Sequence, residues 1–330
     1  MANRWQTILS AALITLIGAA LLWSMDVRPG LLTPGALKST QIHGTKFPIT
    51  LIDAVGDSIQ ITEPPQRIVS ATLATDEILA DLIDPARIAG VTFLADNQAI
   101  SNVADRYPAS IKRIRGEVEE IIALQPDLVF ISPYTRAETV SLLLGTSIPV
   151  VRLSGFNTLA DIESSIQLVA AATGTQKQAE QQLSVFAQRI KQVKNTLAGV
   201  EQPRVLFYNL NGSSVGPGST IDEIIHIAGG HNVIRDTGIK GSQKINEELA
   251  ISLQPDVILV SGWVDQNGTA ASEQLAQRSA WQNVPAVQQK RIYDLNGSWL
   301  FATSQFTWEG IEQVAGILHP QLFSAQEPEQ

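Results

Sequence analysis

The chain has 330 residues, no cysteine, and 23 lysines and arginines against 32 aspartates and glutamates, which gives a formal charge of −9. Apolar residues make up 44% and charged residues 17%, so a chain that is disordered throughout is excluded, and the length favours two lobes over one core. The acidic balance argues against a nucleic-acid partner, which would require a basic face. The absence of cysteine excludes disulfides, thiolate nucleophiles, cysteine-ligated zinc and iron–sulfur clusters.

The N-terminus has the features of an export or anchoring signal. No charged residue lies between Trp5 and Met25, which is long enough for a membrane span. We therefore interpret residues 1–25 as a signal peptide or an N-terminal membrane anchor, which places the rest of the chain in the periplasm or otherwise outside the cytoplasm. Trp5 and Trp23, near opposite ends, favour the anchor. Residues 26–46 contain several prolines and glycines and are predicted to form a flexible linker.

Beyond the linker, short β-rich runs alternate with helical patterns, which is typical of an α/β chain with parallel sheets. Several runs are apolar at consecutive positions, as expected for strands covered by helices on both faces. The runs are Arg67–Ser70, Arg87–Thr92, Asp127–Ser132 and Val150–Leu153, then Arg204–Asn209, Asp256–Ser261 and Arg291–Leu295. We predict an N-terminal α/β lobe over residues 47–173 and a C-terminal α/β lobe over 200–323, with a tail at 324–330.

The two halves repeat one plan. The segment Val118–Ser132 recurs as Glu247–Ser261, and Asp76-Glu-Ile-Leu recurs as Asp222-Glu-Ile-Ile. The repeat is too long for a solenoid unit and indicates two similar domains. Within it, Asp127 and Asp256 follow a proline at the start of a strand, so we interpret them as strand-entry residues and not as catalytic carboxylates.

A long helical stretch separates the halves. Residues 159–173 are predicted to form one helix that ends near Gly174, and apolar residues at intervals of three and four predict a second helix over 176–198. Residues 174–199 are therefore the expected connection, stiff enough to limit lobe closure to small angles.

The sequence offers no recognisable catalytic machinery. His43, His226, His231 and His319 show no metal-ligand spacing, and no nucleophile–base motif is present. We predict a non-enzyme without a cofactor or a resident metal.

Several segments resemble the substrate-binding proteins of ABC transporters for iron–siderophore complexes, cobalamin and haem. The resemblance covers residues 47–323 and is carried by Ile49–Ser70, Asp76–Leu82, Arg87–Thr92, Glu119–Ser132 and Trp281–Tyr293. It implies two Rossmann-like lobes with parallel sheets, joined by one long α-helix, with the ligand cleft between the lobes. It also implies a monomer that docks on an ABC-transporter permease dimer through one glutamate per lobe, and the matching residues are Glu119 and Glu248.

The loops that follow the strands are expected to line the ligand site. They carry polar and aromatic candidates at Thr72, Phe93, Tyr134, Arg136, Tyr208, Asn211, Trp263, Trp299 and Phe301. The loops before the docking glutamates add basic residues at Lys112, Arg113, Arg115, Lys240 and Lys244. Basic groups on an acidic protein suit an anionic ferric chelate, so we predict capture of a ferric siderophore for an ABC importer.

Three alternatives stay open. Cobalamin is one, although related cobalamin binders present aromatic residues where this chain has basic ones. Haem is another, because Tyr134 or Tyr208 could supply an axial oxygen ligand. The third is a membrane-anchored ligand sensor or scaffold module that uses the binding fold without transport.

Overall fold

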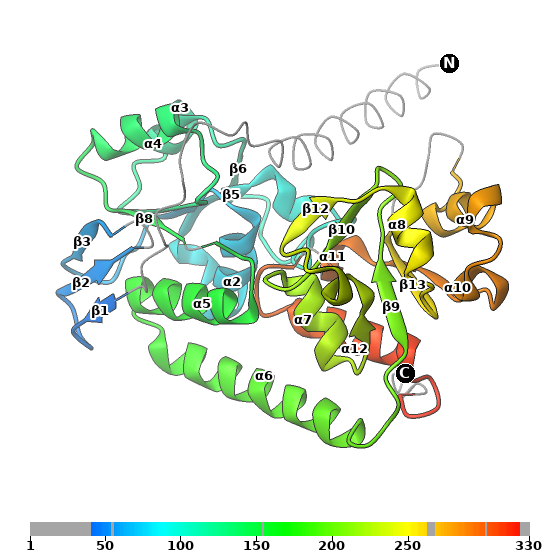
Figure 1. Ribbon diagram of the computed structural model, residues 1–330. Coiled ribbons are helices and arrows are strands. Elements are labelled where there is room, and N and C mark those ends of the chain that lie inside the picture. Colours follow the sequence, from blue (N-terminus) through cyan, green and yellow to red (C-terminus); the bar gives the residue numbers. More distant parts are fainter. Residues whose placement is uncertain (1–40, 54–55, 154, 263–267, 301, 324–330) are drawn as a thin grey trace, which may run out of the picture.

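The computed structural model describes residues 41–323 apart from 54–55, 154, 263–267 and 301. The described chain forms two α/β lobes that lie side by side above one long helix (Figure 1). The predicted signal segment at 1–25 and the tail at 324–330 lie outside the described residues. Within them, no helix is both long enough and apolar enough to cross a membrane.

The N-terminal lobe is built on a five-stranded parallel sheet in the order β6-β5-β4-β7-β8. Every residue of the central strands β4 and β7 is buried, which explains why apolar residues occupy consecutive positions in both. The strands are β4 (Ile68–Ser70), β5 (Ile88–Thr92), β6 (Lys112–Ile114), β7 (Leu128–Ile131) and β8 (Val150–Arg152). The helices are α2 (Leu73–Leu82), α3 (Val118–Ala123), α4 (Ala137–Leu144) and α5 (Leu159–Thr173), with 3₁₀ turns at Pro85–Arg87 and Phe93–Asp96.

A small antiparallel sheet, β1 (Gln41–His43), β2 (Ile49–Ile52) and β3 (Ser58–Ile61), lies beside this lobe. Strand β1 corrects the predicted linker, which was expected to continue to residue 46. Strand β1 has only three residues, all of them exposed, which is too short for an alternation of polar and apolar residues to reveal it in the sequence. Its backbone pairing with β2 is what makes it a strand.

The C-terminal lobe has a four-stranded parallel sheet in the order β11-β9-β13-β14. Its strands are β9 (Arg204–Phe207), β11 (His231–Asn232), β13 (Val257–Ser261) and β14 (Ile292–Leu295), and a separate antiparallel pair joins β10 (Ser213–Val215) to β12 (Ser242–Lys244). The helices are α7 (Thr220–Ile227), α8 (Glu247–Ser252), α9 (Ala271–Ala276), α10 (Pro285–Gln288), α11 (Gly297–Leu300) and α12 (Thr307–Leu318), with 3₁₀ turns at Val233–Thr237 and Ser279–Trp281. The predicted α/β class with parallel sheets is confirmed.

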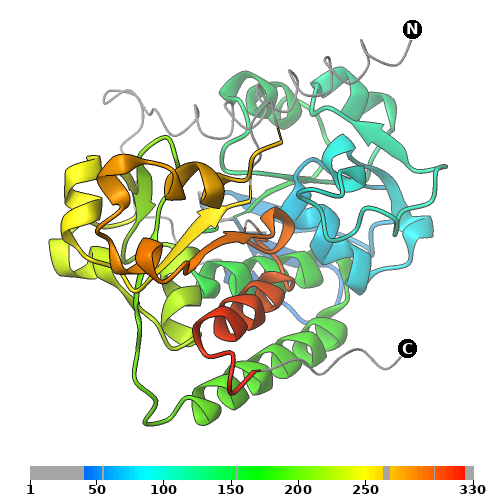
Figure 2. The same cartoon turned by 90° about the vertical axis from the view of Figure 1, so that its right-hand side faces the viewer.

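The connecting helix α6 spans Gln176–Thr196 and reaches about 32 Å at the standard rise per residue. It buries Ala179, Phe186 and Val193 at intervals of seven residues and packs against α5 on one lobe and α12 on the other (Figures 1 and 2). Buried apolar residues of both lobes and of α6 form one continuous cluster. The lobes are therefore joined by a shared core as well as by the helix.

The internal repeat extends to backbone geometry. Gln125 and Gln254 occupy equivalent positions and both have positive φ, 47° and 46°. The carboxylate of Asp127 accepts hydrogen bonds from the backbone amides of Gln66 and Arg67 at 2.6 and 2.9 Å, and Asp256 accepts one from that of Arg204 at 2.9 Å. The two aspartates thus fix the entry of a neighbouring strand, which confirms the structural role predicted for them.

Candidate functional site

The carboxyl ends of β5 and β6 bring Phe93 and Arg115 together. The guanidinium carbon of Arg115 lies 5.4 Å from the centroid of the Phe93 ring, and the Arg115 side chain is exposed. The backbone amide of Arg115 donates to a carboxylate oxygen of Glu120 at 2.7 Å. No ion pair involves the Arg115 guanidinium among the described residues, so its charge is held in place by an aromatic face and stays available to an anion.

Tyr134 and Arg136 follow β7 at the same edge of the sheet. Tyr134 is 70% exposed. Arg136 forms an ion pair with Glu117 at 2.8 Å, and both side chains are more than half exposed. Exposed pairs of this kind contribute little to stability, so a ligand can replace Glu117 as the partner of Arg136 with little loss of free energy.

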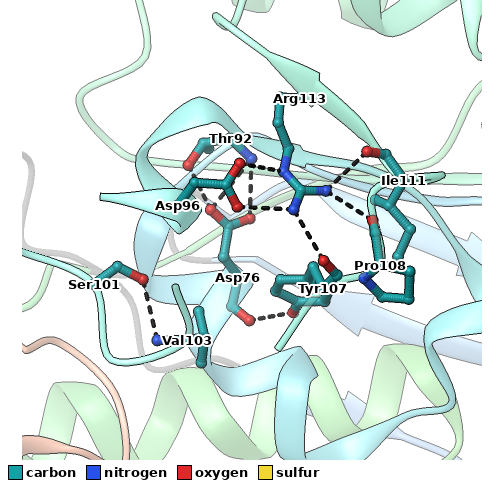
Figure 3. Close-up of polar contacts among 9 residues, drawn as sticks. All are labelled: Asp76, Thr92, Asp96, Ser101, Val103, Tyr107, Pro108, Ile111 and Arg113. Atoms are coloured by element: carbon teal, nitrogen blue, oxygen red, sulfur yellow. Dashed lines mark hydrogen bonds and ion pairs between the residues drawn. The ribbon is translucent and has the colours of Figure 1, made fainter. Parts of the chain in front are cut away.

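Arg113 is placed differently from the prediction. Its guanidinium makes two hydrogen bonds to Asp96, both 2.8 Å, and donates to the backbone carbonyls of Tyr107, Pro108 and Ile111 at 2.8–3.1 Å (Figure 3). These five bonds use all five N–H donors of the group. The hydrogen bonds with Asp96 raise the pKa of Arg113. Arg113 holds the 107–111 loop, and this corrects its assignment as a ligand-binding cation.

A fully buried carboxyl group, Asp76, lies next to the Arg113–Asp96 pair (Figure 3). The amide of Thr92 donates to both oxygens of Asp76 at 3.2–3.3 Å, and the Thr92 hydroxyl donates to one of them. Burial raises the pKa of Asp76 to about 8, against the lowering effect of these bonds. Burial thus favours the neutral form of this carboxyl group, which serves as a structural element of the lobe.

The equivalent carboxylate in the C-terminal lobe, Asp222, is compensated by charge. Arg235 binds it through two nitrogens at 2.6 and 2.9 Å, and the side-chain amide of Asn232 donates to it at 2.8 Å. The sequence echo marked both aspartates, but nothing in it shows that, in the described part of the chain, only Asp222 has a cation among its hydrogen-bond partners.

Tyr208 is also placed differently from the prediction. It is only 2% exposed, and its ring packs against Trp281 with centroids 5.0 Å apart. Burial raises its pKa, which opposes ionisation of the phenol. Trp281 is held in turn by a hydrogen bond of 2.6 Å from its indole nitrogen to Glu247. Tyr208 is a core residue of the C-terminal lobe, and this corrects its assignment to the ligand site.

The remaining predicted residues fall into three groups. Lys112, Lys240 and Lys244 are exposed and belong to no ion pair among the described residues. Trp299 is half-buried on α11, Thr72 caps α2, and the side-chain oxygen of Asn211 accepts hydrogen bonds from the backbone amide and the hydroxyl of Ser213. Trp263 and Phe301 lie outside the described residues.

The predicted docking glutamates occupy matching positions. Glu119 lies in the first turn of α3 and Glu248 in the first turn of α8, and both are exposed. In each of these turns another glutamate is engaged within its own lobe: Glu120 binds the Arg115 amide, and Glu247 binds Arg278 and Trp281. Figure 1 shows α3 and α8 on different lobes in the upper half of the view. The first turns of α3 and α8 thus each present one glutamate, Glu119 or Glu248, whose carboxylate has no hydrogen bond or ion pair with a described residue.

A hollow of about 310 Å³ lies elsewhere, beside the C-terminal end of α6. It is lined by Lys194, Leu197, Val200, Gln202, His226, Ile227, Gly229 and His319. Across the described part of the chain, no group of three or more histidine, aspartate or glutamate side chains is arranged to hold a metal ion.

Comparison with known proteins identifies this architecture. Residues 68–298 match the family model described as periplasmic binding protein. The chain belongs to this family. A Bacillus subtilis relative, the uncharacterized ABC transporter substrate-binding lipoprotein YvrC, is 23% identical over 93% of this chain and 98% of its own length. A cobalamin-binding protein of Halobacterium salinarum is 24% identical over 92% of this chain and 84% of its own.

Solved structures agree in fold. The molybdate-binding protein MolA of Haemophilus influenzae has a TM-score of 0.67 at 20% identity, with 84% of this chain and 93% of that chain covered. The periplasmic haem-binding protein RhuT of a Roseiflexus species has a TM-score of 0.65 at 23% identity, with 78% and 99% covered. The predicted two-lobe class of ABC-transporter binding protein is confirmed.

Proposed function

We propose that this protein captures an anionic ferric chelate, a ferric siderophore, outside the cytoplasm and delivers it to an ABC importer. The observation that carries the proposal is Arg115, whose exposed guanidinium is stacked on Phe93 at the strand ends of an acidic protein. An unpaired guanidinium suits carboxylate or catecholate oxygens, and neighbouring aromatic faces suit the apolar parts of a chelate. Lys240 and Lys244 supply exposed cations from the other lobe, and neither belongs to an ion pair with a described residue.

The revised ligand set is Arg115, Tyr134, Arg136, Lys240, Lys244 and Trp299, together with Trp263 and Phe301, whose placement stays a prediction. Cobalamin and haem are the competing cargoes. The names of relatives favour cobalamin, and the 70% exposure of Tyr134 suits an axial ligand to haem iron. Molybdate, which the Haemophilus relative binds, would need a much smaller anion site.

A binding panel tests the cargo. Tryptophan fluorescence and calorimetry would be recorded with ferric catecholate, ferric hydroxamate, ferric citrate, cobalamin, haem and molybdate. We expect saturable binding of a ferric chelate that weakens at least tenfold in Arg115→Ala. Binding of cobalamin, haem or molybdate with no response to any ferric chelate would overturn the siderophore proposal.

Delivery is tested separately. Glu119 and Glu248 are proposed to pair with arginines of the permease dimer, and exposed charges of this kind steer association more than they add affinity. The double variant Glu119→Ala/Glu248→Ala is expected to bind the cargo normally and to lose uptake in cells. If cells with the double variant take up the cargo normally, the docking assignment is wrong. The same result would be expected if the protein is a sensor that takes no part in uptake.

A further inference from the structure

The Asp-Glu-Ile motif occurs once in each lobe. In both copies the glutamate accepts a hydrogen bond from the opposite lobe. Glu77 follows Asp76 on α2, and Glu223 follows Asp222 on α7. Neither glutamate is explained by the ligand site or by permease docking.

Glu77 binds the segment that leads from α11 to α12. One carboxylate oxygen accepts from the Ser304 hydroxyl at 2.5 Å, and the other accepts from the backbone amide and the side chain of Asn102 at 3.0 and 2.9 Å. Asn102 also donates to the carbonyl of Ser298 at 2.8 Å, and Gln305 donates to the Glu77 carbonyl at 2.7 Å. With Glu77 1% exposed, the N-terminal lobe holds both ends of residues 298–305.

Glu223 makes the reciprocal contact. Its carboxylate accepts from the backbone amide of Leu159, the first residue of α5, at 2.7 Å. This amide has no partner inside the helix, and the positive end of the helix dipole favours an acidic group there. Beside it, the Thr220 hydroxyl donates to the carbonyl of Phe156 at 3.0 Å. The C-terminal lobe thus holds the start of α5 in the N-terminal lobe.

We propose that Glu77 and Glu223 form an inter-lobe clamp that sets the separation of the two lobes and thereby positions the ligand-binding residues. The segment held by Glu77 and Asn102 contains Trp299, so the clamp directly influences the position of one proposed ligand-binding residue. In both motifs the aspartate supports its own lobe and the glutamate fixes the opposite one. The effect on affinity rests on the proposed function, whereas the effect on lobe separation does not.

The absence of cysteine makes the separation measurable. Spin labels on Ser141→Cys in α4 and Ser279→Cys beside α9, both exposed, report the distance between the lobes by pulsed electron resonance. Alanine at Glu77 and Glu223 removes the acceptors, whereas glutamine keeps a carbonyl oxygen in each place. Glu163→Ala, an exposed position on α5, is the matched control.

We expect the ligand-free double alanine variant to show a shifted or broadened distance distribution while its circular dichroism stays native. The double glutamine variant and Glu163→Ala should match the parent. Affinity for the ferric chelate identified by the panel should fall about tenfold in the alanine variant and recover in the glutamine one, because the binding-competent arrangement is less populated. Unchanged distances in the alanine variant would overturn the clamp.

Two further measurements keep the clamp and the cargo separable. If Glu77→Ala does not fold, the single variant Glu223→Ala, at a half-buried position, must still shift the distances between the spin labels. Distances in Glu223→Ala that equal those of the parent would refute the clamp. If no ferric chelate binds the parent, the proposed cargo fails while the distance measurement still decides the clamp. Normal chelate binding with unchanged distances in the alanine variants would support the cargo and refute the clamp.

Discussion

The two equivalent aspartates provide the sharpest physical test of the structure. Asp76 is buried without a cation among its hydrogen-bond partners, whereas Asp222 faces Arg235 through two bonds. The same replacement, aspartate to asparagine, should therefore have opposite effects at the two sites. At position 76 it removes a group that is costly to ionise, and at position 222 it leaves a guanidinium without its partner.

The pH dependence of the free energy of unfolding that Asp76 causes follows, in sign and size, from the linkage between proton binding and folding. Burial raises the pKa of Asp76 from 3.8 to about 8, so between these values the folded state binds one proton more than the unfolded state. The free energy of unfolding then falls as the pH rises, by about 1.4 kcal/mol per unit. Below about pH 4 both states are protonated and the contribution vanishes. From pH 5 to pH 8 the parent should lose at most about 4 kcal/mol through this group.

Asp76→Asn removes that loss, because the amide can accept from the Thr92 amide and donate to a nearby hydroxyl. Asp222→Asn should lower the free energy of unfolding by about 1–2 kcal/mol, a value reduced by the 37% exposure of Arg235. The assay is urea unfolding at pH 5, 6, 7 and 8 for the parent and both variants. Parallel curves for the parent and Asp76→Asn would refute the reasoning, since they would mean that Asp76 is ionised in the folded protein.

Three further outcomes are expected. Arg113→Ala should lower the free energy of unfolding by about 2–3 kcal/mol because it removes five hydrogen bonds, three of which hold the 107–111 loop, whereas Arg115→Ala should weaken chelate binding with an unchanged melting temperature; the reverse pattern would exchange their roles. Glu309→Gln should flatten the decline in stability between about pH 4.5 and 7, because burial raises the pKa of Glu309 to about 7; an unaltered pH profile would contradict this. Trp281→Phe should lower the melting temperature by several degrees through loss of the bond to Glu247, and a stable variant would show that bond to be dispensable.

The lobes, the connecting helix and the strand-entry aspartates could be predicted because each leaves a local pattern. Periodicity marks α6, and a duplicated segment marks Asp127 and Asp256. Arg113 and Arg115 could not be told apart in the same way. They are two residues apart in the sequence, and only the folded chain shows that Asp96 and three carbonyls take the first while Phe93 supports the second.

Tyr208 is a second residue whose surroundings the sequence does not reveal. It directly follows β9, a position that in such sheets commonly faces a ligand. Its burial depends on Trp281, which is remote in sequence and is fixed by Glu247 on a third element. A side chain that follows a strand is available to a ligand only if no later segment covers it, and this is a property of tertiary structure.

The shared core and the clamp together constrain how the protein can hold its cargo. A wide rotation of the lobes would break the contacts of Glu77 and Glu223 and would expose apolar surface that both lobes bury against α6. Each 100 Å² so exposed costs about 2.5 kcal/mol, so an opening of a few hundred Å² would approach the entire stability of a typical domain. Thermal motion therefore allows only small changes in lobe separation. A stiff frame of this kind must be complementary to its ligand beforehand. We therefore expect specificity to reside in the exposed side chains at the strand ends, such as the proposed ligand-binding residues Arg115 and Tyr134, and not in closure around the cargo.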